Sequence, residues 1–201
     1  NKNHKSKKRK KTKYAVFLAD RDFKLKTENQ IFDKKGEQYL SEKYWKNYLN
    51  LFFNKLEKIF KLKIIVAAHP KTNIRNDIKN YRPRRVIENS TLRLMRNATF
   101  AITTHSTSIC YAVTYKKPIF FINSNEIKSQ KNLDLHIKLL ANYFGSKPLN
   151  INQAENKKNL KSFNRLKYSK FKKFEYDFLS SLKNKKENYK IIYNEILKIK
   201  W

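Results

Sequence analysis

Short, almost wholly apolar runs, separated by segments with a helical or loop-like pattern, most strongly constrain the fold of this 201-residue chain. Runs that are apolar on both faces are typical of strands in a parallel sheet covered by helices on both sides. We therefore expect an α/β fold, a Rossmann-like doubly wound parallel sheet with helices on both faces. The runs are Tyr14–Leu18, Leu62–Ala68, Thr99–Thr103 and Pro118–Ile122, with Val86–Ile87 as a shorter candidate.

Apolar residues at helical spacing occupy the gaps between these runs. The longest such pattern extends from Glu37 to about Phe60 and predicts an amphipathic helix that packs on the sheet. Shorter helices are expected at Ser90–Arg96, Ser106–Tyr115, Leu133–Phe144 and Tyr189–Lys200, and inside 155–183. We expect a basic disordered arm over 1–13, an α/β domain over 14–152 and a helical extension over 153–201 that packs on the domain.

The chain is strongly basic, with 47 Lys and Arg against 16 Asp and Glu and a formal net charge of +31. Such an excess predicts an anionic partner, such as nucleic acid, a lipid surface, an acidic polysaccharide or a phosphorylated ligand. Residues 1–13 contain seven Lys, one Arg and no acid. They are either a solvated tail or linker, or an electrostatic contact with anionic lipid or nucleic acid.

Composition excludes several classes of site. The only glycines are Gly36 and Gly145, so neither a G-x-G-x-x-G dinucleotide loop nor a Walker-type phosphate loop can be built. The single cysteine, Cys110, excludes an internal disulfide and every zinc site with several cysteines. The histidines show no metal-ligand spacing, so we expect no metal and no cofactor.

The sequence shows no membrane-spanning segment. The longest uncharged stretch, Asn97–Tyr115, is rich in Thr and Ser and too polar to cross a bilayer. No apolar stretch of signal-peptide length precedes Tyr14. We expect a cytoplasmic protein, with peripheral contact at the inner face of the membrane as a further expectation.

Polar residues follow the predicted strands, and in parallel α/β sheets ligands bind at the carboxyl ends of the strands. Thr104–Ser108 is the most informative of these segments, because hydroxyl donors and a helix N-terminus can together hold a phosphate. The alternative is an ordinary helix N-cap, which also favours serine. The candidate phosphate-binding residues here are His105, Ser106, Thr107 and Ser108, with Thr104 beside them.

His69 follows the second strand, where it can donate to a phosphate, act as an acid or base, or satisfy a neighbouring carbonyl. Cationic side chains from the following loop, Lys71, Arg84 and Arg85, could neutralise the same phosphate, although a solvated loop is the alternative. No partner fixes the role of any nearby acid, so no catalytic residue is assigned. These acids are Asp20, Asp22, Glu88 and Glu126.

Two stretches carry a resemblance to a known family: Ile64–Lys71, which reads IIVAAHPK, and Thr103–Ile122, which reads TTHSTSICYAVTYKKPIFFI. They resemble the C-terminal, donor-binding half of bacterial surface and capsular polysaccharide glycosyltransferases of the two-domain GT-B type. The likeness is strongest to the sialyltransferase and polysialyltransferase pattern, which has a His-Pro motif, a Ser/Thr motif and a Lys-Pro strand. Tyr14–Asp20 is similar to the first strand of that half, and the resemblance extends to about Asn152.

The resemblance implies a nucleotide-sugar donor, with a CMP-linked acidic sugar as the leading expectation, and a glycan acceptor in capsule or surface-polysaccharide biosynthesis. It implies that His69, Ser106, Thr107 and Ser108 hold the donor phosphate. It also implies an acceptor domain before Tyr14. The acidic motif of the family has no counterpart, because Asp20-Arg21-Asp22 lacks the expected glycine.

Two other interpretations remain open at this stage. One is a basic nucleic-acid or anionic-surface binding module without catalysis, since Lys and aromatic residues interleave at Tyr168–Phe178. Nucleic acid is the less favoured partner, because no helix-turn-helix, zinc-finger or RNP signature is present. The other is an inactive remnant that keeps only the fold.

Overall fold

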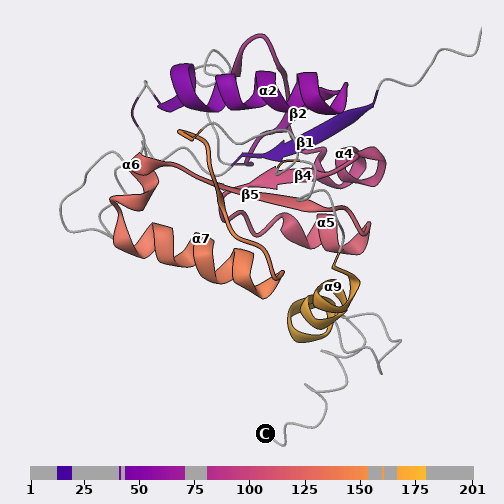
Figure 1. Cartoon of the computed structure of the whole chain (residues 1–201). Coiled ribbons are helices and arrows are strands. Elements are labelled where there is room, and N and C mark those ends of the chain that lie inside the picture. Colours follow the sequence, from indigo (N-terminus) through magenta and orange to yellow (C-terminus); the bar gives the residue numbers. More distant parts are fainter. Residues whose placement is uncertain are drawn as a thin grey trace, which may run out of the picture.

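A six-stranded parallel sheet forms the centre of the part of the chain that the computed structural model describes (Figure 1). That part comprises residues 13–19, 41, 44–70, 81–153, 160 and 167–179. Every neighbouring pair of strands is parallel, and the expected Rossmann-like α/β class is confirmed. The strands are β1 (Tyr14–Leu18), β2 (Lys63–Ala67), β3 (Arg85–Ile87), β4 (Ala101–Thr103), β5 (Ile119–Asn123) and β6 (Leu149–Asn150).

The strand order β3-β2-β1-β4-β5-β6 shows that the sheet is doubly wound. The chain moves outward from β1 to β3, returns to the centre, and then moves outward on the other side from β4 to β6. Phe17 in β1 is paired with Val66 of β2 and with Ile102 of β4. The order therefore reverses between β1 and β4, and ligands of such sheets bind at the carboxyl ends of the strands at this reversal.

Helices cover both faces of the sheet, as Figure 1 shows for α2 on one side and α4 and α5 on the other. The π-helical turn η1 (Tyr44–Leu49) leads into α2 (Asn50–Phe60) on the first face. The second face carries α4 (Thr91–Asn97), α5 (Ile109–Thr114) and α9 (Tyr168–Phe174), which η3 (Glu175–Leu179) continues. The short α6 (Asn125–Lys128) precedes α7 (Lys131–Tyr143), which contributes buried residues to both faces.

The apolar strands are explained by burial on two sides. In β1, Phe17 belongs to the core under α2, where its ring centroid lies 5.0 Å from that of Phe53. Its neighbours Val16 and Leu18 belong to the core on the opposite face. Successive side chains of a strand point to opposite faces, so a strand covered on both sides has no solvated position and is apolar throughout.

Several predicted boundaries differ from the structure. The helix expected at Ser106–Tyr115 is shorter, because Ser106–Ser108 form a turn and α5 begins at Ile109. The strand β6 and the helix α6 were not predicted. A helix inside 155–183 is confirmed by α9, whereas the predicted helix Tyr189–Lys200 and almost all of the arm 1–13 lie outside the described residues.

None of the helices in the described segments has the length and hydropathy needed to cross a bilayer.

Candidate anion-binding site

The candidate site lies at the carboxyl ends of β2, β1 and β4, around the reversal of the strand order. His69 follows β2 by two residues, and Thr104 follows β4 directly. Since β1 lies between these strands and neighbouring strands are spaced by about 4.8 Å, the ends of β2 and β4 are separated by roughly 10 Å. The two motifs therefore flank the carboxyl end of β1.

The hydroxyls of the Thr103–Ser108 turn divide into an inner and an outer group. The Thr103 Oγ1 accepts a hydrogen bond from the Ser106 backbone N–H at 3.2 Å, and the Ser106 Oγ is 3.4 Å from the Ser108 backbone N. Thr103 and Ser106 are buried, whereas Thr107 is exposed and Ser108 is half-buried. The inner hydroxyls therefore hold the shape of the turn, and the outer two can reach a ligand.

Ser108 is the N-cap residue of α5, yet its side chain makes no capping hydrogen bond. The Ser106 hydroxyl accepts from the Ser108 N–H instead, so Ser106 serves the start of the helix and the Ser108 hydroxyl does not. The helix has only six residues, so its dipole is a minor contribution. Hydroxyl and imidazole groups are the side chains at this edge whose chemistry suits an anion.

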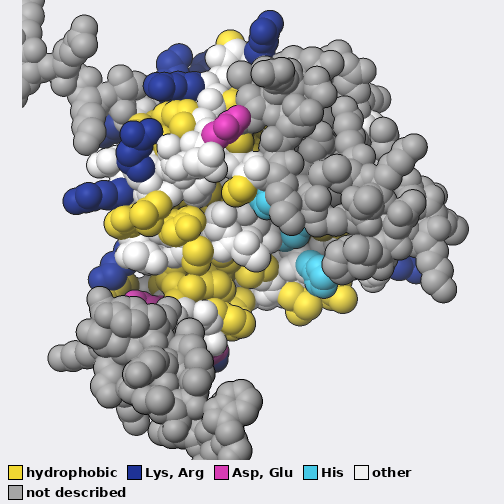
Figure 2. Space-filling view, turned by 180° about the vertical axis from the view of Figure 1, so that it is seen from behind, with side chains coloured by type: hydrophobic (Ala, Val, Ile, Leu, Met, Phe, Trp, Pro, Cys, Tyr) yellow, Lys and Arg dark blue, Asp and Glu magenta, His cyan; other side chains and the backbone are white. Residues whose placement is uncertain are grey.

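Two histidines lie at this edge of the sheet. His105 is half-buried, and its Nδ1 is 3.1 Å from the Thr104 Oγ1, while the half-buried His69 follows the end of β2. On the face drawn in Figure 2, the visible histidine side chains lie near one another, and most of the visible Lys and Arg side chains lie toward the left of the same face. An imidazole can donate to a phosphate oxygen and can carry a positive charge near neutral pH.

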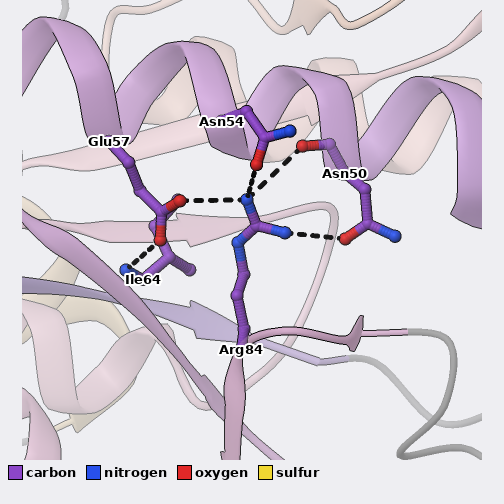
Figure 3. Close-up of polar contacts among 5 residues, drawn as sticks. All are labelled: Asn50, Asn54, Glu57, Ile64 and Arg84. Carbon is purple, nitrogen blue, oxygen red and sulfur yellow. Dashed lines mark hydrogen bonds and ion pairs between the residues drawn. The ribbon is translucent and has the colours of Figure 1, made fainter.

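Arg84 does not lie at this edge of the sheet. Its predicted role, to neutralise a phosphate bound there, is therefore corrected. Its guanidinium points to α2, where Nη2 is 3.0 Å from Glu57 Oε2 and donates to Asn54 Oδ1 at 2.5 Å (Figure 3). Nη1 donates to Asn50 Oδ1 at 2.8 Å, and the side chain is 3% exposed. Burial lowers the pKa of Arg84, and the charge of Glu57 opposes this shift. Arg84 fastens α2 to the sheet instead of binding a ligand.

The other predicted cations are not brought to the candidate site either. Arg85 is exposed and is the first residue of β3, where it pairs with Ile65 in the middle of β2. At about 3.3 Å per residue, this level is roughly 13 Å before His69 along the strand direction. Lys71 lies outside the described residues.

Among the candidate acids, Glu126 already has a partner, because its carboxylate accepts hydrogen bonds from the backbone N–H and the hydroxyl of Ser41. Glu88 follows β3 and is exposed. Asp20 and Asp22 lie outside the described residues. The described geometry thus gives no acid a catalytic role. No group of three or more His, Cys, Asp and Glu within the described ranges could hold a metal ion.

The polar segment Asn123–Glu126, which the sequence places at the end of a predicted strand, forms a buried cluster with a partner, Asp134, that sequence reasoning missed. The Asn123 Nδ2 donates to Asp134 Oδ1 at 2.6 Å, and its Oδ1 accepts from the Ser124 backbone N–H at 2.8 Å. The Ser124 hydroxyl in turn caps α6 by accepting from the Ile127 N–H at 3.0 Å. The polar residues directly after the apolar run were visible in the sequence, but their partner Asp134 lies in the next long helix. The cluster fixes the loop after β5.

Cys110 lies in the first turn of α5, directly after the Thr103–Ser108 turn, and burial raises the pKa of its thiol. Since the thiolate is the reactive form, we expect Cys110 to be alkylated by iodoacetamide at neutral pH more slowly than an unhindered cysteine. Its rate should increase toward the value for a free thiol when the protein is unfolded in urea. Mass spectrometry of the intact protein over time measures both rates. Faster alkylation of the folded protein would contradict this prediction.

Comparison with known proteins found no family model that matches the chain, no match among curated proteins and no match among solved structures.

Proposed function

We propose that the chain is the nucleotide-sugar-binding domain of a glycosyltransferase in capsule or surface-polysaccharide biosynthesis. The donor would be a nucleotide-linked sugar, with a CMP-linked acidic sugar as the first candidate, and the acceptor a glycan. The proposal combines the resemblance of the His-Pro and Ser/Thr motifs to GT-B glycosyltransferases with their positions on the sheet.

The observation that carries the proposal is that both motifs follow strands at the reversal of a 3-2-1-4-5-6 sheet. The His-Pro motif ends β2 and the Ser/Thr motif follows β4, so that the two flank the carboxyl end of β1. This is the position at which sheets of this order bind nucleotides. His69, His105, Thr107 and Ser108 would hold the phosphate, while the buried Ser106 shapes the turn that carries the last three.

We expect CMP to bind the wild-type chain, and to bind the variants His69→Ala and Ser108→Ala at least about tenfold more weakly. Each substitution removes a hydrogen bond to a charged phosphate, and such bonds contribute about 1.5–3 kcal/mol. Titration calorimetry with CMP at fixed ionic strength measures these affinities. Cytidine serves as the companion ligand, because it lacks the phosphate and should lose little affinity in either variant.

His136→Ala and Ser169→Ala are the matched controls, since both residues are exposed and lie in α7 and α9. They should leave the CMP affinity unchanged. If CMP affinity were equal in the wild type, His69→Ala and Ser108→Ala, the assignment of the site would fail. Binding that also fell steeply with added salt would instead favour the alternative, a basic module for nucleic acid or anionic surfaces without catalysis.

A further inference from the structure

The helix formed by α9 and η3 exposes aromatic side chains beside lysines. Tyr168, Tyr176 and Phe178 are 46%, 54% and 63% exposed. Tyr168, Lys172 and Tyr176 are spaced by four residues and so lie on one side of the helix. We call the following residues the basic-aromatic surface: Lys116, Tyr168, Lys172, Lys173, Tyr176 and Phe178.

The basic-aromatic surface is fastened to the domain by the opposite side of the same helix. Phe171 and Phe174 are buried, and their ring centroids lie 5.1 and 5.0 Å from that of Phe144, which follows α7. Figure 1 shows α9 beyond the C-terminal end of α7, away from α6 and the candidate anion-binding site. The exposed side chains are therefore held on a packed helix, at a separate place from that site.

The charges on this surface remain predominantly positive. The Nζ atoms of Lys116 and Lys172 lie 5.2 and 5.0 Å from the centre of the Tyr168 ring. The carboxylate of Asp177 is paired with Lys173 at 2.7 Å, and this contact, together with the hydrogen bond from Tyr143, lowers the pKa of Asp177. Asp177 thus stays ionised and neutralised by Lys173, while Lys116 and Lys172 both contact Tyr168, whose hydroxyl also accepts a hydrogen bond from the Lys116 Nζ at 3.3 Å.

For two of the three exposed rings, Tyr168 and Phe178, the contacts disfavour base stacking. Stacking on a nucleobase needs an open ring face. The ammonium groups of Lys116 and Lys172 lie against Tyr168, and the ring of Phe178 is 4.8 Å from Phe174 with an interplanar angle of 38°. A second copy of a chain with a net charge of +31 would be repelled. Insertion into lipid needs no open ring face, and aromatic rings with neighbouring lysines suit the boundary between headgroups and acyl chains.

We propose that the basic-aromatic surface docks on an anionic phospholipid bilayer. Tyr176 and Phe178 enter the headgroup region, and Lys116 and Lys172 contact lipid phosphates, their aliphatic stems lying along the Tyr168 ring and the bilayer surface. This inference is independent of the proposed function, because it uses none of the residues of the anion-binding site.

Flotation of the full chain with phosphatidylglycerol-containing vesicles tests the proposal. We expect the wild type to float with these vesicles and not with pure phosphatidylcholine vesicles. The double variant Lys116→Glu with Lys172→Glu should bind at least about tenfold more weakly, since each basic residue near an anionic surface contributes severalfold to affinity. The double variant Tyr176→Ser with Phe178→Ser should lose the part of binding that persists at high salt.

Matched controls separate the surface from the general basicity of the chain. Lys58→Glu with Lys131→Glu changes the charge equally at exposed positions of α2 and α7, and Leu51→Ser with Leu92→Ser removes apolar groups that are 63% and 50% exposed. Both controls should float like the wild type. Equal losses in the charge variant and its control would overturn the proposal. It would also be overturned if the basic-aromatic variants lost binding to single-stranded oligothymidylate but kept vesicle binding. Circular dichroism melting verifies that all variants are folded.

Discussion

Replacing Arg84 with alanine is expected to lower the free energy of unfolding by about 3 kcal/mol, because a charge pair with little exposure loses one member. The Arg84 and Glu57 side chains are 3% and 21% exposed. Asn50 and Asn54 lose their guanidinium donor as well, and the guanidinium carbon also lies 5.0 Å from the centre of the Phe53 ring in the core. Urea denaturation followed by circular dichroism measures the loss.

Arg85→Ala is the matched control, because Arg85 is the next residue and is exposed. It should change the free energy of unfolding by less than about 0.5 kcal/mol. Arg84→Lys should be intermediate, since an ammonium keeps the charge but cannot reach Glu57, Asn50 and Asn54 with a planar fork. Equal stability of Arg84→Ala and Arg85→Ala would show that the contacts to α2 contribute nothing.

The parallel sheet could be predicted because the residues of each strand themselves indicate burial on both faces. A run such as Ala15–Leu18 has no polar position, and this pattern needs cover on both faces, which in turn requires helical crossovers between parallel strands. The strand β6 was missed because Leu149 and Asn150 are too few to show a pattern. It forms because the chain passes beside β5, where Ile122 pairs with Leu149.

The role of Arg84 could not be predicted from its own neighbourhood, since Tyr81–Arg85 reads as a solvated cationic loop. The signal was in another element: Asn50, Asn54 and Glu57 lie on one stripe of α2, beside its buried apolar residues. Asn50 and Glu57 are half-buried, and polar groups that lose contact with water need a partner. A search for that partner could have selected a nearby arginine.

The place of the candidate site at the carboxyl ends of the strands could be predicted. Which of its side chains are buried and which are exposed could not. The rule that ligands meet the carboxyl ends of strands selects four segments from the sequence alone: Asp20–Asp22, His69–Thr72, Thr104–Ser108 and Asn123–Glu126. The sequence does not reveal that Ser106 is buried under the turn while Thr107 is exposed. That difference arises from the ending of β4 at Thr103 and the late start of α5, which depend on tertiary packing.

Phe120→Ala is expected to be at least as destabilising as Arg84→Ala, with a loss of about 3–5 kcal/mol in the free energy of unfolding. Phe120 is fully buried in β5, and its ring centroid lies 4.6 Å from that of Phe100 and 5.9 Å from that of Phe60. Alanine leaves a cavity between α2 and the sheet and removes two aromatic contacts. The midpoint of urea denaturation measures the change.

Phe178→Ala provides the control, because it removes the same side chain from a position that is 63% exposed, and it should cost less than about 1 kcal/mol. The two substitutions should also differ in their effect on CMP. Phe120 pairs with Ile102, the residue before Thr103, so its loss loosens the strand that carries the Ser/Thr motif. We expect weaker CMP binding in Phe120→Ala and unchanged binding in Phe178→Ala. A Phe120→Ala protein as stable as Phe178→Ala would show that the ring cluster does not hold β5 against α2.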